Sequence, residues 1–549
     1  MLEVVHEKTA ALEQRERLSR SVIWRLQRSY FNRYGIEAWR TGTVPHHITS
    51  SPFIADAYAR MVLSYLRDCA FSEQRGESST IASLDRSEPV YIVELGSGSG
   101  RFSYLFLSRI LDRYRSSVLQ DVPIKYVMTD FAEQNLEYCR RHPWFQSFIK
   151  DGLLDFARFD VESDQNLKLI HSGETISAND LKKPLVVIAN YVFDSIPQDA
   201  FFVSDGQLYE SLVTLTTTEQ EQELQKQALP SRLELSYEGN PVNGNYYQNA
   251  SWNRILLDYK RRLSETHFLF PTAALQCIRR FYHLSSGRML LLSGDRGYSS
   301  DEALLEGKGV PTMTLHGSFS MMVDYQIIGE YCRHLGGQVL HPGRNAESLN
   351  ISAFMFGDPP GGFVETQQAY AEAIEKFGPD DFFTLKEGIA QIYDALTLDQ
   401  LLAFLRLSCW DYKRFWECLP ILKKQLPDIS NSQKQQLHDV IMKVWDSYLP
   451  IGEESDFAFE LGTLLLEIGF QADALEFLQC SVDLNGTAPG TAYNIAVCHY
   501  SLGQMDQARD YLNQVLELDP EFVEAQTLLR ELESMSAGAI RKQRRKKRA

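Results

Sequence analysis

Along the first part of the chain, apolar side chains recur every three or four residues. This spacing runs through WRLQRSYFNRYG (24–35) and FIADAYARMVLSYLRD (53–68), and it is the period of an amphipathic helix. The loop TGTVPHHITSSPF (41–53) separates the two runs, and residues 72–88 are polar and without a pattern. We therefore expect residues 1–88 to form a helical segment with a cleft-covering loop, ending in a flexible joint.

From Pro89 the pattern changes, because short apolar runs rich in β-branched residues now alternate with helical stretches. The apolar runs are VYIVEL (90–95), IKYVMTD (124–130), FARFDV (156–161), LVVIANYVF (185–193), GRMLLLSGD (287–295) and LNISAFMFG (349–357). Alternating strands and helices are typical of a mostly parallel sheet covered by helices on both faces. The predicted fold class is therefore α/β, in a domain over residues 89–357 with a polar insertion at 214–227.

The C-terminal third of the chain contains a helical repeat. GDPPGG (357–362) marks the end of the α/β domain, and we expect residues 358–384 to be a linker. A shift of 34 residues superposes Ala458 on Ala492, Gly469 on Gly503, Ala474 on Ala508 and Leu478 on Leu512. This period and these small residues resemble the tetratricopeptide repeat, a helix–turn–helix unit, and residues 408–422 resemble a degenerate third copy. The resemblance implies an all-α solenoid over residues 385–535.

Such repeats cannot bury their apolar faces alone, so they stack, and the concave side of the stack commonly binds peptides. A protein substrate or partner is therefore expected to bind to the repeats. The alternative is that the array only buttresses the α/β domain.

The charge of the chain limits its partners. It has 72 Asp and Glu against 55 Lys and Arg, a net charge of −17, so its body is not expected to bind nucleic acid. The exception is the tail, residues 536–549, in which RKQRRKKRA (541–549) carries seven basic side chains among nine. We expect this tail to be disordered, and it either contacts RNA, an acidic partner or an anionic surface or only aids solubility.

Targeting and metal-binding signals are also missing from the sequence. No apolar run approaches the length of a membrane span, and MLEVVHEKTAALEQRERLSR (1–20) lacks the apolar core of a signal peptide. The eight cysteines stand singly, without a CxxC pair, so neither a disulfide framework nor a metal site is indicated. These features predict a cytoplasmic protein without a metal and without a membrane partner.

The stretch VYIVELGSGSGRFSYLF (90–106) gives the first sign of chemistry. A strand runs to Glu94, and glycines follow at positions 96, 98 and 100 before a helical pattern begins. Glycines permit a tight turn and a close approach of a ligand to the backbone, and a carboxylate at this place suits a cationic ligand better than a phosphate. The dinucleotide fingerprint would need glycine at position 101, where the chain has Arg101.

This loop resembles motif I of the Rossmann-like S-adenosylmethionine (SAM) methyltransferases. The resemblance implies that Glu94 meets the amino group of SAM and that the loop makes room for the cofactor with Gly96, Ser97, Gly98 and Gly100. In that fold Asp130, at the end of the next strand, usually binds the ribose hydroxyls, and Asp160 commonly meets the adenine amino group. The alternative for both acids is that they cap helices.

The segment LVVIANYVFDSIPQDAF (185–201) is the most specific signal. It resembles the NEFFDALPV motif of the MidA family of SAM-dependent methyltransferases, which includes the mitochondrial methyltransferase needed for assembly of respiratory complex I. Residues 48–62, 290–298 and 316–337 resemble further landmarks of that family in the same order. The resemblance covers about residues 30–357 and implies methyl transfer from SAM, in the mitochondrial relative to a protein arginine.

The residues after this strand belong to the expected acceptor side. Methyl transfer is an in-line displacement, so the enzyme mainly holds donor and acceptor at near-attack distance. Asn190, expected at the edge of the cofactor site, can accept a hydrogen bond from an acceptor N–H. Tyr191 and Phe193 can pack on a planar or cationic acceptor, and Asp194 can act as a base or bind a guanidinium. The alternative is that Asp194 and Pro197 only shape the loop.

Two departures from the family motifs concern the acceptor. Tyr191 replaces the glutamate that follows the family's asparagine, and Phe53 replaces the glutamate of its TSPE segment. Both changes remove a carboxylate, so a cationic acceptor such as arginine is less firmly implied than SAM. His46 and His47 lie on the loop expected to cover the cleft, where surface histidines usually have no chemical role.

The favoured function is a SAM-dependent methyltransferase that acts on a nitrogen of a protein side chain, with the repeats recruiting the substrate. One alternative is an inactive methyltransferase-like scaffold that acts through its repeats, against which the intact Glu94, Gly96, Gly98 and Asp130 argue. The other is a nicotinamide-dependent oxidoreductase, which Arg101 and the family landmarks disfavour.

Overall fold

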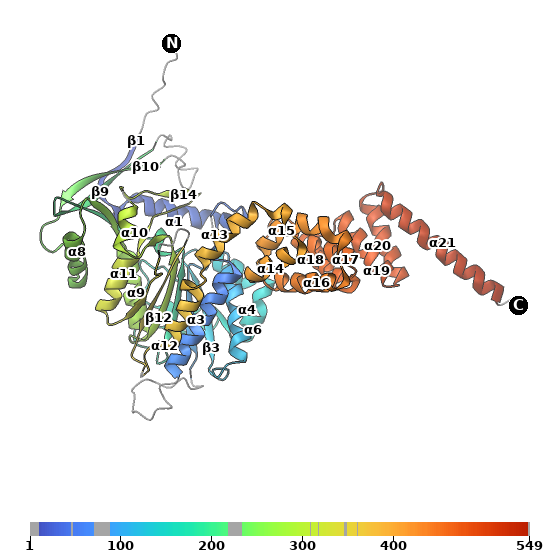
Figure 1. Cartoon of the computed structure of the whole chain (residues 1–549), viewed down its shortest axis with the longest axis horizontal. Helices are drawn as coiled ribbons and strands as arrows, with labels where there is room; N and C mark the ends of the chain where they lie inside the picture. Colours follow the sequence, from blue (N-terminus) through green and yellow to red (C-terminus); the bar gives the residue numbers. More distant parts are fainter. Residues whose placement is uncertain are drawn as a thin grey trace, which may run out of the picture. The chain divides into compact units, whose positions relative to one another are not determined.

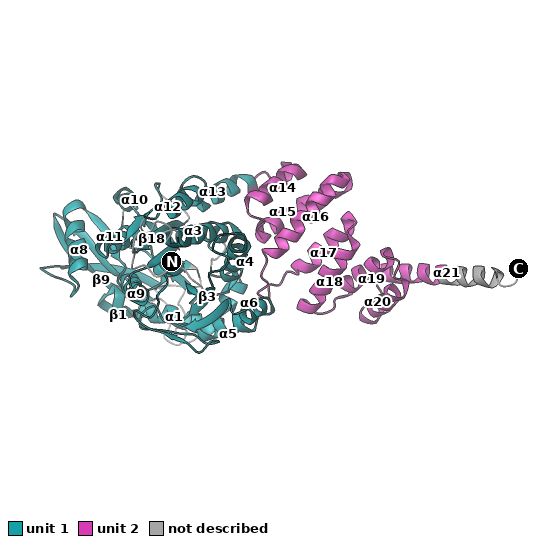
Figure 2. Cartoon of the chain, turned by 90° about the horizontal axis from the view of Figure 1, so that it is seen from below, with its two compact units in different colours: residues 1–389 teal, residues 390–549 magenta. Residues whose placement is uncertain are grey.

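The computed structural model describes residues 10–44, 48–70, 88–217, 233–307, 309–316, 318–344, 349–359 and 361–546. The chain divides into two compact units, Met1–Ile389 and Ala390–Ala549 (Figure 2). Within the described ranges, no helix has both the length and the apolar composition needed to cross a membrane.

The first unit is built around a seven-stranded sheet. In spatial order its strands are β17 (Gln338–Leu340), β18 (Asn350–Phe356), β12 (Met289–Asp295), β7 (Leu185–Asn190), β2 (Val90–Leu95), β3 (Ile124–Asp130) and β4 (Leu154–Arg158). The five strands from β12 to β4 are parallel, and β18 is antiparallel to both of its neighbours. The mixed α/β class predicted from the sequence is thereby confirmed.

Helices cover both faces of this sheet, which explains its continuous apolar strands. On one face, Val93, Val187 and Leu291 share a core with α9 (Thr272–Leu284) and α11 (Tyr325–His334). On the other face lie α3 (Pro52–Ala70) and α4 (Arg101–Arg115), which pack on each other (Figure 1). Ring contacts such as Phe106 with Tyr126, 5.4 Å between centroids, join α4 to the sheet.

A second, antiparallel sheet adjoins this core. It contains β1 (Ala10–Arg17), β9 (Gln207–Thr217), β8 (Asp199–Ser204) and β11 (Thr266–Phe270), and β10 (Leu233–Pro241) also pairs with β9. The prediction that the whole N-terminal segment is helical is therefore wrong for residues 10–17. They form a strand because the edge of β9, far away in the sequence, supplies their backbone partners. Residues 214–217 of the predicted insertion complete β9, and 218–227 lie outside the described residues.

Short elements complete the first unit. The helices are α1 (Val22–Tyr34), α2 (Glu37–Arg40), α5 (Glu133–Arg141), α6 (Gln146–Lys150), α8 (Ala250–Arg262) and α10 (Asp301–Glu306). The two-stranded pairs are β5 (Leu167–Lys168) with β6 (Thr175–Ile176), β13 (Gly297–Tyr298) with β16 (Val323–Asp324), and β14 (Thr314–His316) with β15 (Ser318–Ser320).

Residues 358–384, predicted as a linker, are mostly helical and belong to the first unit. They hold α12 (Val364–Tyr370), a π-helical turn (Ala371–Glu375) and the start of α13 (Pro379–Ala390). Asp68 of α3 accepts hydrogen bonds from the backbone N–H groups of Glu365 at 3.0 Å and Thr366 at 2.9 Å. This carboxylate satisfies free donors at the positive end of α12 and so fixes that helix on α3.

The second unit is helical throughout its described residues. Its helices are α14 (Leu398–Leu407), α15 (Tyr412–Gln425), α16 (Asn431–Asp446), α17 (Phe457–Ile468), α18 (Gln471–Asn485), α19 (Pro489–Ser501), α20 (Met505–Leu518) and α21 (Val523–Lys546). The 34-residue shift carries α17–α18 onto α19–α20, and these helices pack in sequence order. The backbone of α21 extends to Lys546, so it is helix through most of the tail that was predicted to be disordered.

Candidate functional site

The glycine loop after β2 turns the chain sharply into α4. Gly96, Gly98 and Gly100 have φ of +63°, +51° and +77°, a region that only glycine adopts without strain. Close neighbours also exclude a side chain, because a Cβ atom on Gly98 would lie 2.8 Å from Trp39 Cζ2 and one on Gly100 would lie 2.8 Å from Cys139 Sγ. The loop is therefore held in one conformation with bare backbone.

Glu94, expected to meet the amino group of SAM, points into the protein interior. It is 4% exposed, and its Oε2 accepts hydrogen bonds from Tyr126 Oη at 2.8 Å and from the hydroxyl of Ser103 on α4. Burial raises the pKa of Glu94 to about 7, although these two hydrogen bonds oppose the shift. Glu94 thus ties β2 to β3 and α4 beneath the loop. Ser97 is also buried, and its Oγ has no hydrogen-bond partner among the described residues.

Asp130 fixes the end of β3 against the loop. Its carboxylate accepts hydrogen bonds from the Gly98 N–H at 3.1 Å, the Ala132 N–H at 2.8 Å and Asn135 Nδ2 at 3.2 Å. Burial, the largest influence, raises the pKa of Asp130 despite these donors. Asp130 therefore shapes the loop and also borders the cavity described next.

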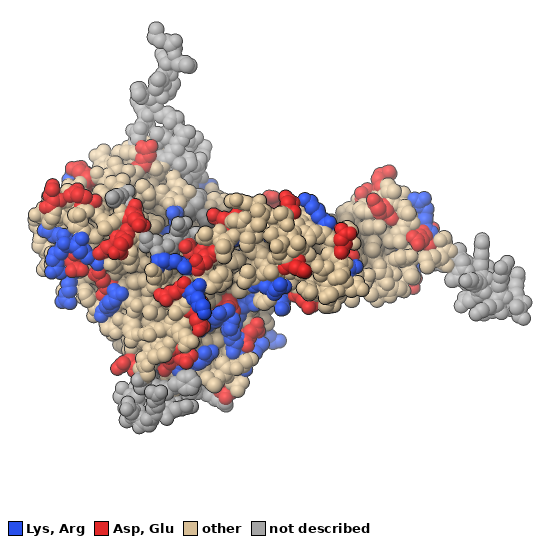
Figure 3. Space-filling model, viewed as in Figure 1, with Lys and Arg blue, Asp and Glu red and all other residues tan. Residues whose placement is uncertain are grey.

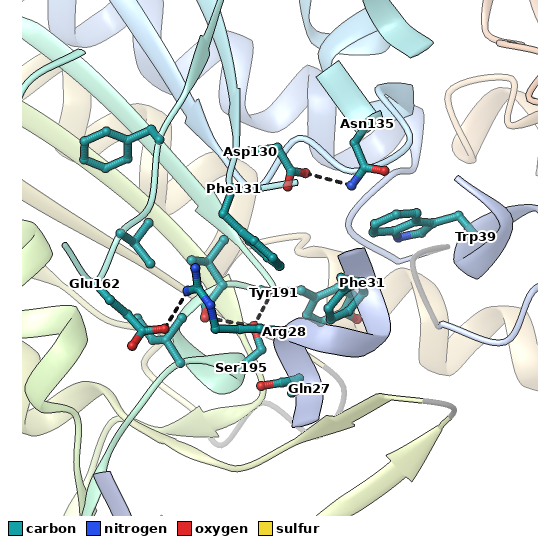
Figure 4. A pocket seen from close by; sticks show the side chains of 15 residues that line it. Gln27, Arg28, Phe31, Trp39, Asp130, Phe131, Asn135, Glu162, Tyr191 and Ser195 are labelled. Carbon is teal, nitrogen blue, oxygen red and sulfur yellow. Dashed lines mark hydrogen bonds and ion pairs between the residues drawn. The ribbon is translucent and has the colours of Figure 1, made fainter. Parts of the chain in front are cut away.

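A cavity of about 100 Å³ lies where β2, β3, β4 and β7 reach their carboxyl ends (Figure 4). Of the predicted site residues, Gly96, Asp130 and Tyr191 line it. Phe131, Phe159 and Val161 supply apolar walls. The remaining side is closed by residues of two helices, namely Gln27, Arg28 and Phe31 of α1 and Trp39 of α2. The sequence pattern predicted helix α1, but nothing in the pattern indicated that this helix faces a site.

Asp160 is bound by Arg28, a residue that the sequence did not indicate as part of the site. Arg28 donates from Nη1 to Asp160 Oδ1 at 3.1 Å and from Nη2 to Oδ2 at 2.6 Å, and the Glu162 N–H donates to Oδ1 at 3.0 Å. Burial alone would raise the pKa of Asp160, but Arg28 and the Glu162 amide outweigh it and the pKa is lowered. Asp160 is therefore ionised and paired.

Asn190, the last residue of β7, meets a tyrosine from α3. Its Oδ1 lies 2.8 Å from Tyr58 Oη, which donates the hydrogen bond, and its Nδ2 has no partner among the described residues. A Cβ on Gly294, opposite Asn190 in β12, would lie 2.9 Å from both Asn190 Oδ1 and Tyr58 Oη. Asn190 thus sits in a tight, partly satisfied polar contact.

The loop after Asn190 contains a strained residue and a buried pair of carboxyl groups. Tyr191 has φ of +53°, which costs a non-glycine residue energy and is frequent at functional sites. Asp194, in the turn after β7 (Phe193–Ser195), and Asp295, the last residue of β12, are both buried, and their carboxyl groups interact with each other. Asp295 Oδ2 also accepts a hydrogen bond from Tyr325 Oη at 3.1 Å. Burial raises the pKa of Asp194 to about 7 and raises that of Asp295 well above its ordinary range, so the pair favours holding a proton near neutral pH.

The remaining residues singled out in the sequence differ in where they lie. Phe193 is fully buried in the core, so its predicted contact with an acceptor is wrong. The Pro197 carbonyl accepts a hydrogen bond from the Ala273 N–H at 3.2 Å. His46 and His47 lie outside the described residues. Within the described ranges, no group of three or more His, Cys, Asp and Glu side chains is arranged to hold a metal ion.

Comparison with protein families gives this site a context. Residues 78–316 match the model of a family described as "Putative S-adenosyl-L-methionine-dependent methyltransferase". The segment matches a methyltransferase family. SAM, the cofactor expected from the sequence, is the cofactor of that family. Residues 491–522 match the tetratricopeptide repeat model, which agrees with the repeat identified by its period.

Solved structures and curated relatives resemble separate parts of the chain. A COG1565 superfamily member from Burkholderia thailandensis, bound to S-adenosyl-homocysteine, is 13% identical, with a TM-score of 0.35 over 56% of this chain and 76% of that chain. The tetratricopeptide protein YrrB is 19% identical, with a TM-score of 0.23 over 31% of this chain and 83% of that chain. Intraflagellar transport protein 70A of Danio rerio is 37% identical over 65 residues, which are 12% of this chain and 10% of that protein.

Proposed function

We propose that residues 89–357 are a Rossmann-like, class I SAM-dependent methyltransferase of the MidA type, with SAM bound in the cavity at the ends of β2, β3, β4 and β7. The strand order supports this, because the chain builds outward from β2 in one direction and then from β7 in the other. Ligands of α/β sheets bind at such a switch point. The observation that carries the proposal is that Gly96, Asp130 and Tyr191 line a cavity at this point, within the family match.

The residues of the cavity fit this cofactor. Gly96 lines the cavity with bare backbone, which a ligand can approach closely. Ser97 follows it in the chain, and the buried Ser97 hydroxyl has no hydrogen-bond partner among the described residues. The Asp130 carboxylate lines the cavity, Asp160 stands between the lining residues Phe159 and Val161, and carboxylates accept the hydrogen bonds that hydroxyl and amino groups donate. In this proposal Asp130 and Asp160 hold the two ends of the adenosine, and Glu94 keeps the loop in place. When bound, SAM supplies an activated methyl group.

On the acceptor side, the proposal gives Asn190, Tyr191 and Asp194 the tasks of positioning the acceptor and removing its proton. Tyr191 lines the cavity and Asp194 lies three residues further along the same loop. A carboxyl group whose pKa is about 7 exchanges protons readily at neutral pH, as a general base must. Asp295 supplies a second carboxyl group close to Tyr191, the position at which the family motif has a glutamate.

The proposed substrate is a nitrogen of a basic protein side chain, recruited by the repeats. Residues 453–533 carry 16 Asp and Glu but only two Arg and no Lys, and acidic side chains of this segment lie on the surface seen in Figure 3. Such a segment attracts polypeptides rich in Lys and Arg. The second candidate function is an inactive scaffold. One observation favours it, because Arg28 already donates hydrogen bonds to the Asp160 carboxylate that would otherwise bind the cofactor.

The test is calorimetric titration of the full chain with S-adenosylhomocysteine, using wild type, Gly98→Arg and Gly152→Arg. Gly152 is the matched control, because its φ is +73° but a Cβ there meets no atom within 4 Å. We expect a Kd on the order of micromolar for wild type and a loss of about 100-fold or more for Gly98→Arg, since its side chain must displace Trp39. Wild-type binding that Gly98→Arg retains would refute this cofactor site.

A further inference from the structure

Arg28 lies inside the proposed cofactor cavity (Figure 4). Its guanidinium makes the paired hydrogen bonds to Asp160 and a third, from Nη1 to Glu162 Oε1, at 2.8 Å. A planar guanidinium matched to a carboxylate is among the strongest ion pairs that proteins form. The carboxylate expected to meet the adenine amino group is therefore already occupied by the protein itself.

The same guanidinium also covers an aromatic wall of the cavity. It lies over the ring of Phe131, 4.7 Å from the ring centroid. Phe131 follows Asp130 directly and lines the cavity. Arg28 thus places a flat group with N–H donors on a ring face and directs those donors to Asp160. An adenine with its amino group would make the same two kinds of contact.

We propose that Arg28 is an internal latch that occupies the adenine end of the cavity and must swing out before SAM binds. The proposal rests on the proposed function, since it takes the ligand to be SAM. It makes cofactor affinity depend on an ion pair within the protein. Only the fraction of molecules with Arg28 displaced is competent to bind, so the latch lowers the apparent affinity by that fraction.

The movement needs only one side chain, because α1 itself is fixed. Gln27 Nε2 donates to the Phe319 carbonyl at 2.6 Å, and Gln134 Nε2 donates to the Asn32 carbonyl at 2.7 Å. Trp24 is buried in the core beside Phe319. The Arg28 side chain is 30% exposed, however, so rotation about its own bonds leads to solvent. The ion pair is also open to screening by salt.

The experiment is calorimetric titration of the full chain with S-adenosylhomocysteine, comparing wild type, Arg28→Met and the control Arg33→Met. Arg33 is exposed on the same helix, where its guanidinium lies 5.7 Å from the centroid of the Tyr34 ring. We expect Arg28→Met to bind about tenfold more tightly than wild type or Arg33→Met. Raising NaCl from about 50 to about 500 mM should tighten binding to wild type but not to Arg28→Met.

Unchanged or weaker binding by Arg28→Met, in a variant that unfolds like wild type, overturns the latch and leaves the cofactor site standing. If Arg28→Met does not fold, Arg28→Lys decides, because lysine keeps the charge and stem but loses the planar fork. Tighter binding by Arg28→Lys than by wild type then supports the latch, and equal or weaker binding overturns it. Folded variants that all fail to bind refute the cofactor site and the latch together.

Discussion

At the scale of single residues, the acids of the site differ in the groups that donate hydrogen bonds to them. Glu94 is held by two hydroxyl groups, Asp130 by three N–H donors and Asp160 by Arg28. The sequence placed all three at or near strand ends, because the apolar runs stop there. It could not show their partners, since Arg28 lies 132 positions from Asp160. For the same reason the sequence left Asp295 unnoticed as the partner of Asp194.

The carboxyl pair predicts how stability depends on pH. Burial raises the pKa of Asp194 to about 7 from an ordinary 3.8, so the folded state binds a proton more readily than the unfolded state. The resulting stabilisation is complete below about pH 4 and is lost as pH rises through 7. We expect the free energy of unfolding to fall between about pH 5 and pH 8, and the fall to be about 2 kcal/mol smaller in Asp194→Asn.

Denaturant titrations at about pH 5 and pH 8 would measure the free energy of unfolding of wild type and Asp194→Asn. Asp151 is an exposed acid at the end of α6, so Asp151→Asn serves as the control. The pKa of Glu94 and that of Asp324 are also raised to about 7, primarily by burial. The variant should therefore reduce the fall in stability without abolishing it. An equal fall in wild type and Asp194→Asn would show that Asp194 takes up no proton on folding.

At the scale of elements, prediction succeeded where the periodicity of a segment and its packing agreed. The strands of the central sheet and the helices α1 and α3 follow their apolar patterns. The structure of residues 10–17 and 358–384 was not predicted correctly, because the elements that they pack against, β9 and α3, are remote in sequence. The 34-residue repeat was visible because each repeat packs on its neighbour with the same small residues.

That packing gives a matched pair of glycine variants. Gly462 is buried in α17, and a Cβ there would lie 2.8 Å from Leu478 Cγ of α18, whereas at Gly490 the nearest atom, Phe459 Cζ, is 4.0 Å away. We expect Gly462→Ala to destabilise the repeats by about 1–3 kcal/mol through overpacking. Gly490→Ala should be neutral or stabilise α19 by up to about 1 kcal/mol, since alanine favours helices.

Thermal unfolding of the full chain, followed by circular dichroism, would compare the two variants. We expect a lower transition temperature for Gly462→Ala alone. Equal transition temperatures would mean that α17 and α18 do not approach each other at Gly462 as closely as described.

At the scale of the whole molecule, the chain joins a unit that matches a methyltransferase family over residues 78–316 to a unit with a tetratricopeptide repeat at 491–522. The sequence predicted this combination, because each unit has its own period of apolar residues. What the sequence could not predict is that the N-terminal helix closes the cavity, since that depends on contacts between remote segments. The cofactor site and the latch that we propose therefore depend on the assembled first unit.

The most direct test of the central claim is a crystal structure of the full chain grown with S-adenosylhomocysteine. We expect the ligand in the cavity at the ends of β2, β3, β4 and β7, with its ribose at Asp130, its adenine at Asp160 and Phe131, and Arg28 turned out toward solvent. Ligand bound elsewhere, or a cavity still closed by Arg28 at saturating ligand, would contradict it.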